Sequence, residues 1–170
     1  MKNLLLLVTI FVSLSVFGQT KIGHVDSQKL LDTMQSRKIA MQKLDDFRAE
    51  GIKELQEMQK AFEALYLKFE KNKVDMTPVL IKIEEEKLMK KQQDIEARQG
   101  ELERDLQAYN EELNKPILDR IQKAIEIVAD RKKLSYVIDE TATLYFKGGI
   151  DCTAEAIIEV VKLDNEAVKK

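Results

Sequence analysis

Few residues of this 170-residue chain could support catalysis or metal binding. His24 is the only histidine and has no cysteine near it in the sequence, so we expect a structural role rather than a ligand or general-base role. Cys152 is the only cysteine, which excludes an intrachain disulfide and favours a small buried residue near a helix start over a reactive thiol. No phosphate-loop, dinucleotide-binding or nucleophile-elbow motif occurs. We therefore predict that the chain is not an enzyme and has no cofactor or metal site.

The distribution of charged residues also argues against catalysis. The 30 acidic residues fall mostly in long Glu/Lys-rich runs, such as the EEE at 84–86, which are typical of solvated helix faces. Such helices offer no concave pocket that could shift a carboxyl pKa for catalysis. The net charge of −2 gives no bulk basic surface, so we predict no binding to nucleic acid.

The chain begins MKNLLLLVTIFVSLSVFGQT, which has the pattern of a secretory signal peptide over residues 1–18, with cleavage near Gly18. A membrane anchor is the weaker interpretation, because the apolar run is short and no stop-transfer signal follows. The absence of a cysteine at the cleavage point disfavours a lipoprotein.

Strand-like segments lie at both ends of the remaining chain and helices lie between them. Residues 22–25 (IGHV) predict a strand, and Leu134–Asp139 and Thr143–Phe146 predict two more. Gly148-Gly149 predicts a turn, and Asp151 or Thr153 caps a final amphipathic helix. Because the terminal strands must meet to pair, the middle is forced out as a hairpin. We expect an α+β protein, mostly α, with a body of residues 19–35 and 115–170 and an arm of residues 36–114.

The arm has the hydrophobic pattern of an antiparallel coiled coil. Before the pair Thr77-Pro78 the apolar residues recur with a mean spacing of 3.5, and after it they recur every seven residues. Thr77 predicts a helix cap and Pro78 the first helical residue, so the tip of the hairpin lies near residues 75–77. The predicted seam residues are Met41, Leu44, Phe47, Ile52, Leu55, Met58, Phe62, Leu65 and Phe69 on the first helix, and Ile81, Leu88, Ile95, Leu102 and Tyr109 on the second.

Two features indicate a soft arm. The second seam position of the returning helix is polar at Glu85, Gln92 and Gln99, which indicates either an arm able to splay or simply a loose, solvated hairpin. Gly51 and Gly100 fall at one level of the hairpin, and we interpret them as a hinge, with close helix packing or chance as the alternatives. Pro116 should kink or interrupt the returning helix.

The outer arm carries more large apolar residues than a two-helix seam can bury. Either some are exposed on one side of the arm, or all pack within the hairpin. Residues 66–91 carry a net charge of +2 and residues 92–114 a net charge of −5, so a mildly basic tip follows an acidic shaft.

The terminal segments resemble those of the Skp/OmpH family of periplasmic chaperones. The resemblance rests on KIGHVD before a long helix, on IQKAIEIVADRKKLSYVIDE, and on DCTAEAIIEVVK, in this order and spacing. The resemblance covers essentially the whole mature chain, although the arm is similar only in having a coiled-coil pattern.

The resemblance implies a jellyfish-like homotrimer with three arms around a cavity, and an ATP-independent holdase that binds unfolded outer-membrane β-barrel proteins in the periplasm. The arm residues assigned to client binding are Met58, Phe62, Leu65, Tyr66, Phe69, Ile81 and Leu88. The residues assigned to the trimer body are Ile22, Val25, Tyr136, Val137, Ile138, Leu144, Tyr145 and Phe146.

The chain departs from the family in charge, because family members commonly have strongly basic arms. We therefore carry over no lipopolysaccharide site, allow only a weak membrane-surface contact at the arm tips, and expect client capture to depend weakly on salt. The alternative function is a structural coiled-coil adaptor of the envelope that binds one folded partner. The sequence alone leaves open the client list and the number of subunits.

Overall fold

The computed structural model describes residues 21–169, and the predicted signal peptide lies outside them. The chain divides into two compact units, which we call the body (Met1–Ser36 with Ile117–Lys170) and the arm (Arg37–Pro116). Helices α3 (Gln35–Asn72) and α4 (Pro78–Lys132) contribute residues to both units. No helix within residues 21–169 is long and apolar enough to cross a membrane.

The body contains a three-stranded sheet in the order β2-β1-β3. The central strand β1 (Ile22–Val25) pairs in parallel with β2 (Tyr136–Asp139) and with β3 (Ile150–Asp151). The predicted strand at residues 22–25 is thus confirmed. Gly23 allows the close packing around β1, because a Cβ there would lie 2.6 Å from Leu134 Cδ1.

The prediction of a strand at Thr143–Phe146 is wrong. These residues form a loop after the 3₁₀ helix η3 (Glu140–Ala142), and the third strand is Ile150–Asp151. The apolar and aromatic residues of the loop favour strand structure only where a partner is available. Both edges of β1 are occupied by β2 and β3, so no edge of this strand is left for residues 143–146. The second strand is also shorter than predicted, because Leu134 donates to the carbonyl of Ala129 at the end of α4.

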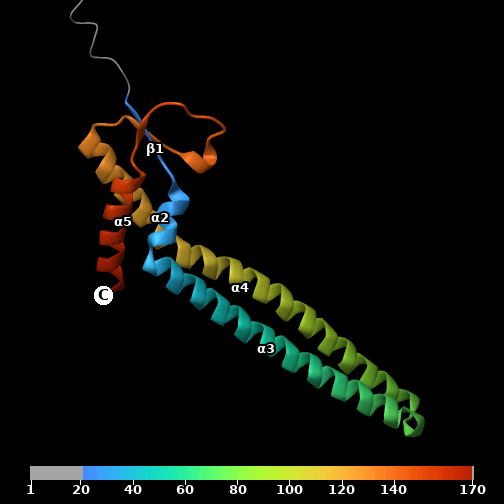
Figure 1. Ribbon diagram of the computed structural model, residues 1–170. Coiled ribbons are helices and arrows are strands. Elements are labelled where there is room, and N and C mark those ends of the chain that lie inside the picture. The colour runs from blue at the N-terminus through green and yellow to red at the C-terminus, as the bar shows by residue number, and fades with distance from the viewer. Residues whose placement is uncertain (1–20, 170) are drawn as a thin grey trace, which may run out of the picture. The chain divides into compact units, whose positions relative to one another are not determined.

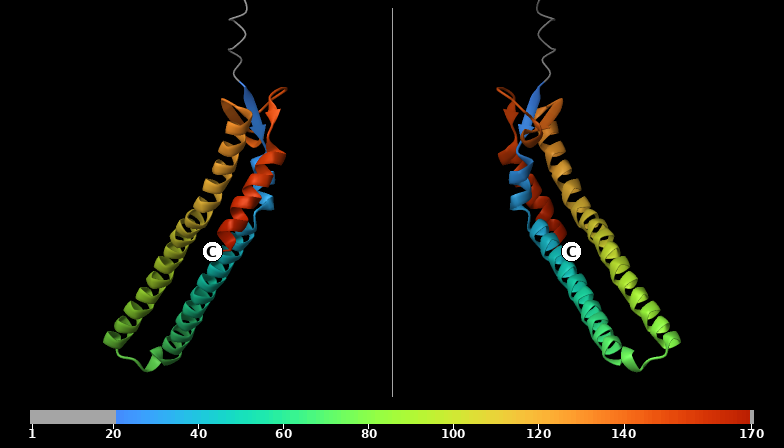
Figure 2. Two further views of the ribbon diagram at one scale, coloured as in Figure 1. Left: turned by 90° about the vertical axis from the view of Figure 1, so that its left-hand side faces the viewer. Right: turned by 90° about the vertical axis from the view of Figure 1, so that its right-hand side faces the viewer.

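Helices pack beneath the sheet. Helix α2 (Ser27–Thr33) starts where the Asp26 carboxylate accepts the backbone N–H of Lys29 at 3.0 Å. Helix α5 (Thr153–Val168), the predicted amphipathic helix, lies beside α2 and begins where Asp151 Oδ1 accepts the N–H of Thr153 at 2.8 Å (Figures 1 and 2). The buried core of the body comprises Val25, Leu30, Met34, Ile117, Ile121, Ala124, Val128, Cys152, Ala156 and Val160.

One buried polar cluster links three helices of the body. Asp164 of α5 is only 2% exposed and accepts the backbone N–H of Ser36, in the first turn of α3, at 3.0 Å. The Ser36 hydroxyl also donates to Asp164 and accepts from Arg120 of α4 at 2.9 Å. Arg120 Nε lies 3.2 Å from Asp164 Oδ1, as an ion pair without hydrogen-bond alignment. The charge of Asp164 is therefore both paired and hydrogen-bonded inside the body.

Within the arm, α3 and α4 run side by side to the tip (Figure 2). Phe47 packs against Tyr109 at a ring-centroid distance of 5.2 Å, Glu54 pairs with Arg98, and Lys73 pairs with Glu85. Toward the tip, the residue numbers of these contacts rise from Phe47 to Lys73 on one side and fall from Tyr109 to Glu85 on the other. Between the helices lies a short 3₁₀ turn, η2 (Lys73–Asp75), and α4 then begins at Pro78 as predicted, with Thr77 Oγ1 accepting the N–H of Leu80 at 3.4 Å.

Two further predictions for the helices need correction. Helix α4 continues through Pro116, so the predicted interruption does not occur. The proline removes one N–H donor, and the carbonyl it would have bonded belongs to Glu112, an exposed residue whose carbonyl water can reach. In the seam of α3, Met41 is 56% and Ile52 is 44% exposed, whereas Gly51 is buried. The seam therefore passes through Gly51 rather than Ile52.

Candidate interaction surfaces

The apolar residues assigned to the body divide into buried and exposed sets. Val25 is buried at 2% exposure and Val137 is half-buried. The exposed members are Ile22, Tyr136 and Ile138 on the strands and Leu144, Tyr145 and Phe146 in the loop that follows η3. Leu144 is fully exposed in the single chain. Within residues 21–169, the body thus presents a group of large apolar side chains that no other part of the chain covers.

A groove of about 500 Å³ lies beside the sheet, between β2, α2 and α4. Its apolar lining is Val25, Leu31, Leu118, Ile121, Ile125, Ala129 and Val137. Ser27 and Asp139 form part of its polar lining. Leu118, which sequence analysis did not single out, is 54% exposed at the groove. The groove adds to the uncovered apolar surface of the body.

Asp139 is held in its charged form. Burial raises the pKa of its carboxyl, but hydrogen bonds from Ser27 Oγ at 2.5 Å and from the N–H of Thr141 at 3.0 Å outweigh burial, and the pKa lies below its usual value. Burial raises the pKa of the Cys152 thiol, which agrees with the predicted structural role of this cysteine.

The arm residues assigned to client binding occupy different environments. Phe69 is buried at 5% exposure, while Leu65 and Tyr66 are 44% and 46% exposed. Met58, Phe62, Ile81 and Leu88 are half-buried between these extremes. Phe69 therefore packs in the seam, and the most accessible of the predicted residues are Leu65 and Tyr66.

Other large apolar residues of the outer arm are also exposed. Leu67 is 60% exposed, as the apolar surplus suggested, and further exposed side chains lie on both sides of the tip. These are Val74, Val79, Leu80, Ile83 and Met89. They lie outside the heptad positions that form the seam. An apolar residue at such a position is expected to be exposed, and this is the signal that could have identified them. A depression of about 310 Å³ between Leu65 and Leu88 has a charged rim of Glu84, Lys87, Lys90, Lys91 and Asp94.

The proposed hinge glycines also differ in environment. Gly51 is buried and Gly100 is half-buried. Near them, Arg98 donates two hydrogen bonds to Glu54, at 2.8 and 3.1 Å. These bonds lower the pKa of the Glu54 carboxyl and raise that of Arg98. The middle of the arm thus contains an ion pair between α3 and α4 as well as two glycines.

Comparison with known proteins gives matches for family and fold. Residues 21–160 match the family model described as outer membrane protein (OmpH-like). A crystal structure from Caulobacter crescentus, described as a candidate outer membrane chaperone (OmpH-like), superposes with a TM-score of 0.71 at 15% identity, covering 88% of this chain and 86% of that one. A search of curated proteins found no match.

Proposed function

Because the chain belongs to the OmpH-like family, as its resemblance predicted, we propose that it is a periplasmic holdase chaperone that binds unfolded outer-membrane β-barrel proteins. The observation that carries the proposal is the apolar surface of the outer arm. Leu65, Tyr66, Leu67 and Met89 remain exposed although the seam between the helices is already occupied by residues such as Phe69, Ile95 and Leu102. Many such weak contacts would hold an unfolded chain without fixing its conformation.

We further propose that the protein assembles through its body as a homotrimer, with the antiparallel coiled-coil arms enclosing a cavity. Two features of the body support assembly. Tyr136, Leu144 and Tyr145 are exposed to 64% or more, and the apolar groove lined by Leu118 and Ile121 is open. A second copy of the chain is the occupant that would bury both surfaces, since burial of apolar area drives most protein association. Bending of the arm at Gly51 and Gly100 would adjust the cavity to clients of different size.

Client binding is tested by aggregation suppression. An unfolded β-barrel protein is diluted from denaturant with and without the chaperone, and light scattering follows its aggregation. We expect the wild type to suppress scattering and the double variant Leu65→Gln/Tyr66→Gln to lose most of this effect. The matched control is Ile39→Gln/Met41→Gln, which removes two exposed apolar side chains of the arm far from its tip in sequence. If the wild type leaves aggregation unchanged, the structural-adaptor function would be favoured instead.

Assembly is tested by the mass in solution from light scattering. We expect three chains per particle for the wild type and dissociation for Leu144→Asp/Tyr145→Asp. These two side chains are 107% and 77% exposed, so their replacement removes little packing within one chain. Val79→Asp, at an exposed position near the tip of the arm, is the matched control and should keep the wild-type mass. A compact monomer at micromolar concentration would refute the proposed assembly.

A further inference from the structure

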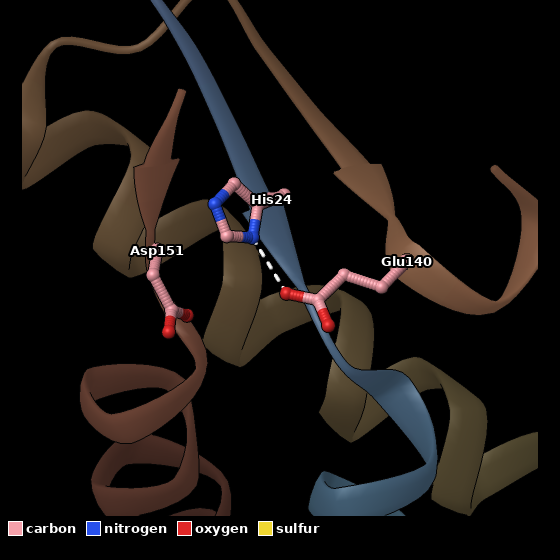
Figure 3. Close-up of side chains that lie close together, drawn as sticks. All are labelled: His24, Glu140 and Asp151. Atoms are coloured by element: carbon pink, nitrogen blue, oxygen red, sulfur yellow. Dashed lines mark hydrogen bonds and ion pairs between the residues drawn. The ribbon is translucent and has the colours of Figure 1, made fainter. Parts of the chain in front are cut away.

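Three potential metal ligands from separate segments meet at one edge of the body sheet. His24 lies in β1, Glu140 is the first residue of η3, and Asp151 lies in β3 (Figure 3). Each residue offers one ligand atom, and these three atoms lie within 4.8 Å of one another. We predicted a structural role for His24 because no second histidine or cysteine is near it in the sequence. The two carboxylates beside it are distant in sequence and are brought there by the fold.

The parallel sheet explains why these residues meet. His24 pairs in register with Asp151 on one side of β1, and Val25 pairs with Asp139 on the other, so Glu140 follows at the same end. Parallel strands bring their carboxyl ends to one edge of a sheet. Residues separated by more than a hundred positions in sequence are therefore neighbours at this edge.

The imidazole of His24 is held in place from two sides. Its Nδ1 lies 2.6 Å from Glu140 Oε1, and the Phe146 ring packs against it at a centroid distance of 4.8 Å. Gly149 lets the chain before β3 approach closely, since a Cβ there would lie 3.2 Å from His24 Cδ2. This glycine has a φ of +111°, a conformation that other residues rarely adopt. The contacts with Phe146 and Gly149 thus hold the ring independently of its hydrogen bond to Glu140, which an ion must break.

The charges around the cluster favour a cation. Glu140 and Asp151 supply two carboxylates, and Thr153 donates its backbone N–H to Asp151 Oδ1 at 2.8 Å. Lys29 interacts electrostatically with both carboxylates, but its amine is paired at 3.0 Å with Asp26. Asp151 is exposed, so an ion has a path from solvent.

We propose that His24, Glu140 and Asp151 form a binding site for a divalent transition-metal ion of the zinc class. One imidazole and two carboxylates suit Zn²⁺, whereas Mg²⁺ and Ca²⁺ prefer all-oxygen ligands. With bonds of about 2.0–2.2 Å, ligand atoms around a tetrahedral ion lie roughly 3.4 Å apart. Binding requires Nδ1 and Glu140 Oε1 to separate and Asp151 to close in. The ion takes the place of the hydrogen bond between Nδ1 and Glu140 Oε1, and water takes the fourth position.

The ion would add a further link between three segments that the short strands, the His24–Glu140 hydrogen bond and the His24–Phe146 ring contact already bring together. Glu140 and Asp151 flank the exposed loop that contains Leu144, Tyr145 and Phe146. A metal bridge from both ends of this loop to β1 would restrain the loop and stabilise the folded body, because the ion binds the folded chain and not the unfolded one.

The experiment is calorimetric titration of the metal-free protein, freed of any histidine tag, with zinc chloride. We expect one Zn²⁺ per chain and a rise in the midpoint of thermal unfolding. The variants Glu140→Gln and Asp151→Asn keep the shape of each side chain and its ability to accept a hydrogen bond. Each should weaken Zn²⁺ binding at least about tenfold, the lower end of the loss seen even for groups that only support a metal ligand. Circular dichroism would verify that both variants are folded.

Glu166→Gln is the matched control, since it removes one exposed negative charge from the same unit and should leave Zn²⁺ affinity unchanged. Cobalt provides a second readout, because Co²⁺ in a site with nitrogen and oxygen ligands gives visible absorption that both ligand variants should abolish. Three results would overturn the proposal: a folded wild type that binds no Zn²⁺, equal binding by wild type and both ligand variants, or binding of Ca²⁺ as tight as that of Zn²⁺.

Discussion

Leu102 of α4 packs directly over Gly51 of α3, so closely that a Cβ at position 51 would lie 2.3 Å from Leu102 Cδ1. Gly51 thus occupies a seam position of α3, and the side chain of Leu102 fills the space that a larger residue would need. Leu102 is itself buried at 5% exposure and has little room to move. Gly100 is different, since a Cβ there would meet only Arg104 Nη1 at 3.7 Å, an ordinary contact.

The two glycines should therefore respond differently to alanine. Gly51→Ala should lower the stability of the arm, because overpacking costs about 1–3 kcal/mol and better helix propensity returns only about 1 kcal/mol. Gly100→Ala should instead stabilise the arm by up to about 1 kcal/mol, since only the propensity term remains. Hydrogen exchange of arm amides, together with denaturant unfolding followed by circular dichroism, measures both effects.

A double-mutant cycle checks the cause. Leu102→Ala alone should cost about 2–5 kcal/mol, and the pair Gly51→Ala/Leu102→Ala should cost less than the sum of the single changes, because each makes room for the other. Additive costs would refute the packing explanation. The proposed hinge makes a separate prediction, namely that both glycine variants reduce capture of large clients.

The start of α4 and the family were predictable from sequence because each depends on local residues and short motifs, whereas the break at Met34 between α2 and α3 was not predicted. Thr77 and Pro78 start α4 through a hydroxyl cap and a preset φ, which require no distant contact. The strand Ile22–Val25 likewise has a short apolar pattern of its own. The heptads of α4 predicted the burial of Ile95 and Leu102 for the same reason.

The remaining features depend on contacts between distant residues. Thr143–Phe146 has strand-like residues, but β1 has only two edges and Ile150–Asp151 occupies one of them. The seam passes through Gly51 because Leu102 fills the gap, which hydrophobic periodicity cannot indicate when the seam residue has no side chain. The cluster of His24, Glu140 and Asp151 follows from the register of the sheet and not from any spacing in the sequence.

Asp164 should be essential for the stability of the body. Asp164→Ala would leave Arg120 without its carboxylate partner and the N–H of Ser36 without an acceptor. Breaking a buried ion pair costs about 3–5 kcal/mol, and we expect the lower end here because the Arg120 side chain retains 19% exposure. Urea unfolding monitored by circular dichroism measures the loss.

The control for this change is Glu166→Ala, an exposed acid on the same helix that should shift stability by no more than about 0.5 kcal/mol. Replacing both charges, as in Asp164→Leu/Arg120→Met, should recover part of the loss, since no buried charge is then left unpaired. A variant Asp164→Ala as stable as the control would show that the ion pair contributes nothing.

Acid should destabilise the body through three carboxyls. The pKa of Asp26 is lowered by the N–H of Lys29 and that of Asp151 by the N–H of Thr153, while hydrogen bonds from Ser27 and Thr141 lower that of Asp139 against the effect of burial. Each usual value is 3.8, so the folded chain binds fewer protons than the unfolded chain at acidic pH. Their contribution to stability is complete above that pH and is lost as the pH falls through the lowered values.

Thermal unfolding between about pH 6 and about pH 2.5 tests this expectation. The unfolding midpoint of the wild type should fall steeply below its plateau, and that of Asp139→Asn should fall less, because one of the three linked groups is gone. Glu166→Gln should retain the wild-type profile. Parallel profiles for wild type and Asp139→Asn would exclude Asp139 as a source of the acid sensitivity.

Client capture should depend weakly on salt. The outer arm offers Leu65, Tyr66 and Leu67 for apolar contact, and its lysines lie among acids, as Lys87 does in its 2.6 Å pair with Glu84. Raising the ionic strength from 0.1 M to 1 M shortens the Debye length from about 10 Å to about 3 Å, which would abolish capture driven by surface charge but leave apolar contact intact. Aggregation suppression measured at both salt concentrations distinguishes the two.

The matched variant for this prediction neutralises three lysines beside the Leu65 depression, as Lys87→Gln/Lys90→Gln/Lys91→Gln. It should retain most of the capture that Leu65→Gln/Tyr66→Gln loses, because the lysines contribute little binding energy at exposed positions. A steep fall of wild-type capture with salt, or a triple lysine variant as defective as the apolar one, would mean that charge rather than apolar surface holds the client. The basic excess of the tip would then be the feature that selects clients.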